Sequence, residues 1–337
     1  MPRLNILIVG SGNETEAFYN KLKKSNFAER IYLAGKTSYC KDYINFKDYD
    51  ELAQNALKKN IDFVFITSEN EICNGTTNIL ASYGLNCIGT NKKYSRLASS
   101  KLFAKIFMDK YNIQHPKTLE DDYENFPIII KSDDIFTKNS PQIIYSKEEK
   151  KNAINKFKKN YFFEEYLNGE ELSVISFFDG EKLLNFEPIK NEIRNNIFAG
   201  SYCPYFLNYE QYDKLQNYLT RFEHALLEDD ANFKGFIISN LIWNNNDWIV
   251  LSFNVSSGEK QTQTLMTHLK SDILTTLVYG TNPAYKDKTS ATLWIENINE
   301  FPKSEDIQVC GNLKNKNISI STTNNFPFKI LEKYINN

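Results

Sequence analysis

The sequence predicts an α/β protein whose first hundred or so residues form a parallel sheet covered by helices on both faces. Two observations predict this class: short apolar runs alternate with helical stretches, and glycines or polar turns separate them. An apolar content of 41%, with 14% aromatic residues, indicates a folded chain. A length of 337 residues allows two or three domains, each with its own core.

The first segment, residues 1–100, contains four predicted strands and three predicted helices. The strands are Leu4–Val9 and residues 31–34, 61–66 and 86–88, and the helices cover residues 14–24, 49–59 and 76–83. Gly10-Ser11-Gly12 directly follows the first strand, which is typical of a tight strand-to-helix turn. We expect the first domain to end near residue 100.

The next segment, residues 101–285, mixes helices with strands that turn back on themselves. Helices are predicted over residues 101–111, 148–159 and 209–228, and strands over residues 126–131, 161–167, 172–178 and 183–186. Residues 236–243 and 248–253 form an antiparallel hairpin across a turn of three asparagines and an aspartate. Residues after about 286 form a small tail of short strands.

Charge and composition argue against several classes of protein. The formal net charge is −2 and the pI is about 6.1, so the chain does not have the basic character of a general nucleic-acid binder. The five cysteines form no C-x-x-C pair and the three histidines lack ligand spacing. We therefore expect buried free thiols in a reducing cytoplasm and no histidine-based metal site. No signal peptide or membrane-length apolar run is present, so no membrane association is expected.

A lysine at the end of a buried strand is a candidate phosphate ligand. The apolar run Phe126–Ile130 ends at Lys131, and a polar stretch then leads back to another apolar pair, Ile143-Ile144. Phosphate loops usually contain glycines, because a Cβ obstructs the approach of backbone N–H groups. This loop has none, so it occupies the position of a nucleotide loop without the glycine grip.

Four stretches, in this order and spacing, resemble glycinamide ribonucleotide synthetase, the phosphoribosylamine–glycine ligase family of purine biosynthesis. They are residues 87–105, Phe163–Ser173, Gly200–Pro204 and Ser252–Gln263. The resemblance implies a Rossmann-like N-terminal domain over residues 1–100 and an ATP-grasp domain over 101–285. It also implies a small lid at about 118–185 and a truncated, β-rich C-terminal domain over 286–337.

The resemblance assigns ATP binding to five residues. Lys101 and Lys131 match the two lysines that neutralise triphosphate oxygens, a task that suits flexible point charges. Glu164 and Leu167 match the adenine hinge, and Glu171 matches the carboxylate that holds the ribose hydroxyls. Two surface lysines and a plain strand–turn–strand with exposed glutamates are the open alternatives.

Two ligand-binding motifs of the family are degraded here. Only Asp133 matches the first half of the phosphate loop, and Asn139 stands at the motif lysine's position, one place after Lys138. A weaker lid using Lys138 and Ser140 is therefore expected. The family's Mg²⁺-binding Glu-Phe-Asn reads Ser252-Phe253-Asn254, which leaves Asn254 as the matched ligand and predicts a weakened Mg²⁺ site. Asn240, on the paired strand, offers a carbonyl but no charge.

The match on the substrate side is mixed. The resemblance assigns substrate contacts to Gly10, Gly12, Glu69, Gly200, Tyr202, Gly258, Thr262 and Gln263. Asn13-Glu14-Thr15-Glu16 replaces the family's Gly-Arg-Glu-His after the glycine-rich turn, and acids make a poor phosphate site. The arginine of the family's last motif is replaced by Ser256. For Tyr202, a packing role is the alternative.

The resemblance implies an ATP-dependent ligase that joins glycine to phosphoribosylamine through a glycyl phosphate. It further implies ATP and Mg²⁺ as cofactors, a cytoplasmic location, and a monomer or weak dimer without nucleic-acid or membrane partners. Two other hypotheses stay open. The first is a catalytically impaired or inactive ATP-grasp protein that binds nucleotide or a partner, because the metal carboxylate, the lid glycines and the arginine are lost. The second is a ligase for another amine, because the substrate contacts changed most.

Overall fold

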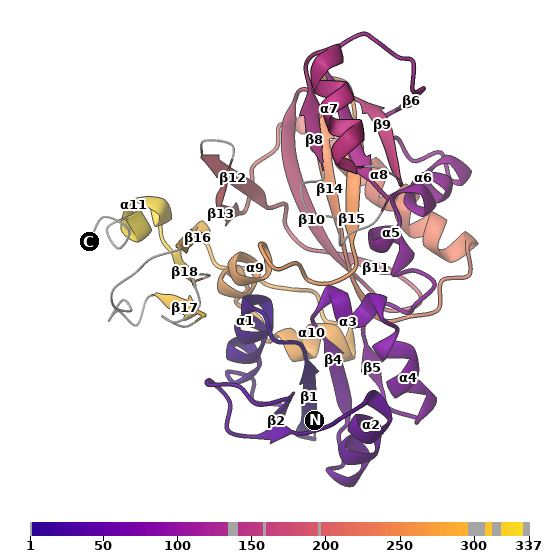
Figure 1. Cartoon of the computed structure of the whole chain (residues 1–337). Coiled ribbons are helices and arrows are strands. Elements are labelled where there is room, and N and C mark those ends of the chain that lie inside the picture. The colour runs from indigo at the N-terminus through magenta and orange to yellow at the C-terminus, as the bar shows by residue number, and fades with distance from the viewer. Residues whose placement is uncertain are drawn as a thin grey trace.

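The computed structural model describes residues 2–133, 141–157, 160–194, 197–295, 307–311 and 318–332. These residues form four sheets, with helices packed around and between them (Figure 1). The N-terminal parallel sheet lies at the bottom of Figure 1, two antiparallel sheets lie above it, and the C-terminal sheet lies to the left. In the part of the chain that is described, every helix is too short or too polar to span a membrane.

The N-terminal sheet has the strand order β3-β2-β1-β4-β5, and all of its pairs are parallel. Its strands are β1 (Leu4–Val9), β2 (Ala28–Ala34), β3 (Tyr43–Ile44), β4 (Phe63–Ile66) and β5 (Cys87–Ile88). Its helices are α1 (Asn13–Leu22), α2 (Tyr49–Lys58), α3 (Glu69–Cys73) and α4 (Thr76–Ser82). Ile6, Leu7 and Ile8 are fully buried although they alternate between faces, because helices cover both sides. The predicted parallel α/β domain is confirmed.

The turn between β1 and α1 requires small residues. A Cβ on Gly10 would lie 2.3 Å from Thr67 Oγ1 and 2.5 Å from Thr15 Oγ1, so no larger side chain fits there. These two hydroxyls are themselves 2.8 Å apart and join α1 to the end of β4. The glycine therefore brings the start of α1 close to the carboxyl edge of the sheet, where ligands bind in α/β proteins.

The smaller antiparallel sheet has the order β6-β9-β7-β8. Its strands are β6 (Thr118–Leu119), β7 (Ile128–Ser132), β8 (Gln142–Ile144) and β9 (Tyr161–Glu165), with α7 (Lys147–Phe157) against it. Ile128, Ile130 and Phe163 form its buried core. Two helices, α5 (Arg96–Ser99) and α6 (Lys101–Lys110), connect the N-terminal sheet to this unit.

The larger antiparallel sheet has the order β11-β10-β14-β15. Its strands are β10 (Glu170–Phe178), β11 (Leu183–Asn185), β14 (Gly235–Trp243) and β15 (Trp248–Asn254), and α8 (Tyr209–Glu228) packs on it. Asn208 and Gln211 form a capping box that fixes the start of α8. The hairpin turn contains Asn245 at φ +72°, a conformation that asparagine tolerates well.

The C-terminal sheet has the order β12-β13-β16-β18-β17 and combines two distant parts of the chain. Its strands are β12 (Lys190–Arg194), β13 (Ile197–Cys203), β16 (Ser290–Ile295), β17 (Gln308–Cys310) and β18 (Ile318–Thr323). Helices α9 (Thr262–His268), α10 (Ile273–Tyr279) and α11 (Pro327–Leu331) complete the fold. Helix α9 lies between α1 and this sheet. The sequence analysis assigned no strand to residues 190–203, so this pairing was missed.

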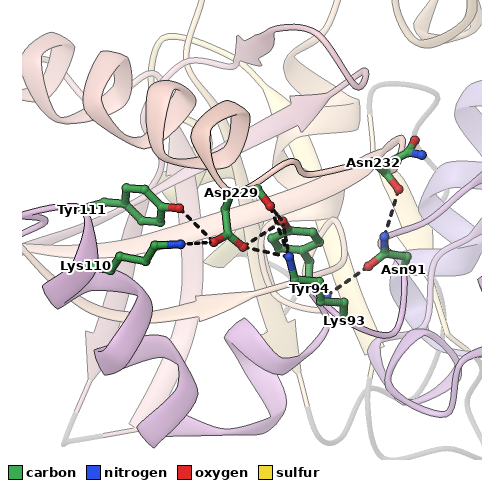
Figure 2. Close-up of polar contacts among 7 residues, drawn as sticks. All are labelled: Asn91, Lys93, Tyr94, Lys110, Tyr111, Asp229 and Asn232. Carbon is green, nitrogen blue, oxygen red and sulfur yellow. Dashed lines mark hydrogen bonds and ion pairs between the residues drawn. The ribbon is translucent and has the colours of Figure 1, made fainter.

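Asp229, at the end of α8, joins that helix to the segment around α6 (Figure 2). Its Oδ1 accepts from Lys110 Nζ at 2.7 Å and from Tyr111 Oη at 2.8 Å. Its Oδ2 accepts from Lys93 Nζ at 3.0 Å and from Tyr94 Oη at 2.9 Å. Burial alone would raise the pKa of Asp229, but these bonds outweigh it and hold the pKa well below the usual range. The contacts fix how α8 sits against the N-terminal part of the molecule.

Candidate active site

A cleft of about 870 Å³ lies between the parallel sheet, the β7–β9 sheet and the β14–β15 hairpin. Seven residues from the sequence-based set line it: Glu69, Lys101, Lys131, Leu167, Glu171, Asn254 and Gly258. Seven others do not line it: Gly10, Gly12, Glu164, Gly200, Tyr202, Thr262 and Gln263. Lys138, Asn139 and Ser140, the expected lid residues, lie outside the described residues.

Lys101 and Lys131 supply positive charge to one part of the cleft. Lys131 is at the end of β7 and donates to the Leu251 carbonyl of β15 at 3.2 Å, so it faces the hairpin as expected. Lys101 is the first residue of α6. Burial lowers the pKa of Lys101, and the charge of Lys131 lowers it further. An anionic ligand here would relieve that repulsion, which makes this part of the cleft suitable for phosphate.

Glu164 has a different position from the one that the sequence suggested. Its carboxylate is 3% exposed and lies between two lysines, with Oε1 2.8 Å from Lys105 Nζ and Oε2 2.6 Å from Lys131 Nζ. Glu164 lies opposite Ile129 in the pairing of β9 with β7, so its side chain is on the same face of the sheet as Ile129 and Lys131, which line the cleft. Glu164 therefore fixes Lys131, and both oxygens of its carboxylate are occupied by lysines. Lys105, one helical turn after Lys101, was missed by the sequence analysis.

The connection from β9 to β10 forms another wall of the cleft. Tyr166, Leu167 and Asn168 line it and lie between the two strands, outside the sheet. A Cβ on Gly169 would lie 2.0 Å from the Trp243 carbonyl oxygen, so only glycine allows this close approach. Glu171 lines the cleft on the next strand. Burial raises the pKa of its carboxyl, and nearby Lys190 and Lys131 offset part of that rise.

Asn254 lies in a network of polar side chains at the end of β15. Its Oδ1 accepts from Asn240 Nδ2 at 3.0 Å, and its Nδ2 donates to both oxygens of Glu69 at 3.0 and 3.2 Å. Asn240 Nδ2 also lies 3.1 Å from Ser252 Oγ. The Glu69 carboxylate accepts a further bond from the backbone N–H of Val255 at 3.0 Å. The sequence treated Glu69 and Asn254 as ligands of different molecules, whereas they bind each other.

In this network Glu69 provides the carboxylate, and the other side-chain oxygens are neutral. Magnesium prefers an octahedron of oxygens that includes carboxylate charge. Ser252, Asn240 and Asn254 offer neutral oxygens, and the Asn254 oxygen already accepts a hydrogen bond. Glu69 is the carboxylate nearest in the network and is occupied by the Asn254 amide and Val255.

A second group of potential ligands lies near the C-terminal sheet. Within the described residues, ligand atoms of Glu187, Cys203 and His268 lie within 4.8 Å of one another. His268 Nε2 is 2.8 Å from Glu187 Oε2, and its ring stacks on Tyr285. Burial lowers the pKa of His268. The residues are far apart in sequence, so spacing gave no signal of this cluster, and a paired histidine accounts for its geometry.

Glu14, in the first turn of α1, was not among the residues assigned from the sequence. It is 7% exposed, lines the cleft, and folds back so closely that a Cβ on Gly12 would lie 2.0 Å from Glu14 Oε2. Thr15 Oγ1 lies 3.5 Å from Oε1, and Oε2 has no hydrogen-bond partner among the described residues. Burial raises the pKa of Glu14 to about 7; backbone N–H groups of Glu14 and Gly12 offset part of this rise, and Glu259 adds to it.

Gly200 and Tyr202 lie in the C-terminal sheet, away from the cleft lining. Gly200 is in β13, and a Cβ there would lie 2.1 Å from the Thr292 carbonyl oxygen of β16. Tyr202 packs edge-on against Phe328, with ring centroids 5.7 Å apart. Both residues therefore serve sheet packing in this structure, which is the alternative that the sequence analysis left open for Tyr202.

Thr262 and Gln263 lie at the start of α9. Thr262 Oγ1 donates to the Gly258 carbonyl oxygen at 2.6 Å and so satisfies the backbone before the helix. Gln263 is 1% exposed, and neither polar atom of its side chain has a hydrogen-bond partner in the described part of the chain. Gly258 itself has φ +83°, which favours glycine, and lines the cleft.

Comparison with known proteins identifies what this chain is similar to. Residues 4–98 match the model of the phosphoribosylglycinamide synthetase N domain, and residues 99–262 match that of its ATP-grasp (A) domain. A phosphoribosylamine–glycine ligase of Fusobacterium nucleatum is 26% identical over 318 residues, covering 84% of this chain and 75% of the relative. The corresponding ligase of Clostridium acetobutylicum is 27% identical over 309 residues, covering 80% and 73%.

Solved structures show the same fold. Phosphoribosylamine–glycine ligase from Thermotoga maritima superposes with a TM-score of 0.77 at 16% identity, covering 96% of this chain and 93% of the other. An ADP complex of N5-carboxyaminoimidazole ribonucleotide synthetase gives a TM-score of 0.73 at 13% identity, covering 99% and 96%.

Proposed function

The chain belongs to the phosphoribosylglycinamide synthetase family, and we propose that it is an ATP-dependent carbon–nitrogen ligase of purine biosynthesis. In the proposed reaction, ATP phosphorylates the carboxylate of glycine and leaves as ADP. The amine of phosphoribosylamine then attacks the acyl phosphate, forms the amide and releases inorganic phosphate. The observation that carries this proposal is that Lys101, Lys131 and the β9–β10 connection line a single cleft.

The roles of the protein groups follow from their positions. Lys101 and Lys131 neutralise the phosphate oxygens, and the buried Glu164 holds Lys131 in place. Backbone groups near Leu167 bind the adenine edge, and Glu171 accepts from the ribose hydroxyls. The protein supplies positioning and electrostatic stabilisation, and no side chain acts as a nucleophile.

We propose that Mg²⁺ is bound more weakly here than the family's motif implies. Ser252 replaces a carboxylate, and the oxygen of Asn254 is engaged by Asn240. Magnesium supplies positive charge to phosphate oxygens wherever it accompanies ATP. In this chain the lysines carry more of that charge neutralisation.

The domain division remains a proposal: residues 1–100, 101–285 with a lid at about 118–185, and 286–337. A monomeric or weakly dimeric state in the cytoplasm is proposed in the same way, as are substrate roles for Glu69 and Gly258, which line the cleft. Limited proteolysis tests the boundaries, and sedimentation velocity tests the assembly.

A second candidate function is nucleotide binding without turnover. The hydrogen bonds between Glu69 and Asn254 favour it, because they occupy groups that the resemblance assigns to substrate and metal. In this reading the cleft binds ATP or ADP, while amide formation is absent or strongly reduced.

One experiment separates these functions. ADP release and amide formation are measured with ATP, glycine and phosphoribosylamine, and nucleotide affinity is measured by calorimetry. Lys131→Met should weaken nucleotide binding at least tenfold, whereas Lys156→Met on the exposed face of α7 should not. Binding with turnover supports the ligase, and binding without turnover supports the second function. Absence of nucleotide binding in the wild-type protein would refute both.

A further inference from the structure

The N-terminus of α1 has the general features of an anion-binding site. The turn Gly10-Ser11-Gly12 leads into a helix of ten residues, whose first backbone N–H groups have no partner within the helix. Such termini attract phosphates and carboxylates because the N–H groups and the helix dipole point toward the ligand. This terminus also adjoins the cleft, because Glu14 and Thr67 line it.

The carboxylate of Glu14 fills the space beside this turn. Glu14 Oε1 and Oε2 would lie 2.6 and 2.0 Å from a Cβ on Gly12, so the carboxylate rests on the glycine itself. The backbone N–H groups of Gly12 and Glu14 stabilise its negative charge. The chain therefore carries an anion of its own at the position where an external anion would meet the turn.

The charged and titratable groups around Glu14 add to this effect. Glu259, on the loop before α9, also lines the cleft and repels the Glu14 carboxylate. From the other side, the Tyr39 hydroxyl is close enough for Glu14 to raise the pKa of Tyr39. Tyr39 Oη has no hydrogen-bond partner within the described ranges. A phosphate that entered here would meet two carboxylates before it reached the backbone N–H groups.

We propose that the carboxylate of Glu14, when ionised, competes with phosphate at the glycine-rich turn and so determines which amines the cleft accepts. The proposal rests on the proposed function in one respect, namely that the amine substrate binds at this end of the cleft. A phosphorylated amine binds well only when Glu14 is neutral or displaced. An amine without phosphate meets no such barrier.

The test measures the affinity of ribose 5-phosphate, ribose and inorganic phosphate by calorimetry, in the presence of ADP. The proteins are wild type, Glu14→Gln, Glu14→Ala and the control Glu16→Gln. Glu16 lies on the same helix, but its carboxylate accepts from the Gly311 N–H at 2.7 Å and does not line the cleft. The control thus removes an equal charge from α1 but leaves the Glu14 carboxylate against the glycine-rich turn.

At pH 8, Glu14→Gln should bind ribose 5-phosphate and inorganic phosphate at least tenfold more tightly than wild type. Ribose should bind equally to both, and Glu16→Gln should behave as wild type. As the pH falls from 8 to 6, the gap between wild type and Glu14→Gln should close. The phosphate probe titrates over the same range, so the variant serves as the reference at each pH. Glu14→Ala should reproduce the gain if Glu14→Gln does not fold, and ADP binding reports folding for each protein.

Several outcomes would overturn the inference. The first is that wild type and both Glu14 variants bind ribose 5-phosphate with equal affinity at pH 8. The second is that Glu16→Gln gains as much affinity for ribose 5-phosphate as Glu14→Gln does. The third is that no protein that binds ADP also binds phosphate. Amide formation by wild type with a KM for phosphoribosylamine no higher than that of Glu14→Gln would also overturn it, while the proposed function would stand. Conversely, a gain of phosphate binding without amide formation by any variant would support the inference and count against the proposed function.

Discussion

Burial of Glu14 makes a quantitative prediction about how stability depends on pH. The pKa of Glu14 is raised from its usual 4.5 to about 7 in the folded protein, and the side chain is nine-tenths buried. The folded state therefore binds this proton more tightly than the unfolded state does. The resulting stabilisation is fully present below pH 4.5 and is lost as the pH rises through 7. A tenfold change in a protonation equilibrium equals about 1.4 kcal/mol, so the whole effect is about 3 kcal/mol.

The perturbation is Glu14→Gln, which keeps the shape of the side chain and cannot ionise. Urea unfolding of both proteins at pH 5, 6, 7 and 8 gives the difference between their free energies of unfolding. That difference should move in favour of the variant by about 2.5 kcal/mol between pH 5 and pH 8. Taking the difference cancels groups that titrate equally in both proteins.

Glu16→Gln is the control, because it also removes a carboxyl from α1, one that is less buried. The difference in free energy of unfolding between Glu16→Gln and wild type should change less with pH than the difference between Glu14→Gln and wild type. A difference in free energy of unfolding between wild type and Glu14→Gln that stays constant from pH 5 to pH 8 would refute the reasoning, because it would mean that Glu14 does not titrate in this range.

Three further predictions concern the polar networks. Glu164→Gln leaves the buried Lys131 cation without its carboxylate and should lower the free energy of unfolding by about 3–5 kcal/mol, measured in urea; an unchanged value would contradict a buried ion pair. Ser252→Glu should make nucleotide affinity more dependent on Mg²⁺, which calorimetry with Mg²⁺ and with chelator measures; loss of all wild-type binding in chelator would show that other groups complete the metal site. Asp229→Asn weakens the bonds from Lys93 and Lys110 and should cost roughly 2 kcal/mol at pH 7, a loss that should shrink as wild-type Asp229 becomes protonated in acid; an equal loss at every pH would show that the charge is unimportant.

Local periodicity predicted most of the elements because it depends on neighbouring residues. Helix α8 spans residues 209–228 as predicted, and β1 matches Leu4–Val9. Lys131 could be placed facing the β14–β15 hairpin because a buried strand ends there and the resemblance supplied the partner. These successes concern patterns that are complete within about twenty residues or that follow the order of the motifs.

The features that the sequence did not predict depend on the direction in which a side chain points or on contacts between distant segments. Glu164 and Glu165 are adjacent and chemically alike, so sequence alone gave no reason to turn Glu164 toward Lys105 and Lys131. The fold-back of Glu14 onto Gly12 depends on the three-dimensional turn. Residues 190–203 carry little periodicity, and Gly200 to Cys203 pair with residues of β16 about ninety positions away. Both the inner role of Glu164 and the C-terminal sheet were therefore beyond the sequence analysis.

The pairing of β13 with β16 also limits how this protein can be shortened. Gly200 to Cys203 pair with Leu293 to Ser290, and a chain of buried hydroxyls runs from Ser201 through Thr264 to Thr292. A chain that stopped at residue 285 would keep β13 but lose its neighbour, exposing a strand edge and buried hydroxyls together. Open edges of this kind template aggregation. The segment after residue 285 is thus needed to complete the C-terminal sheet, and mutations in β16 should reduce the yield of folded protein without changing the residues that line the cleft.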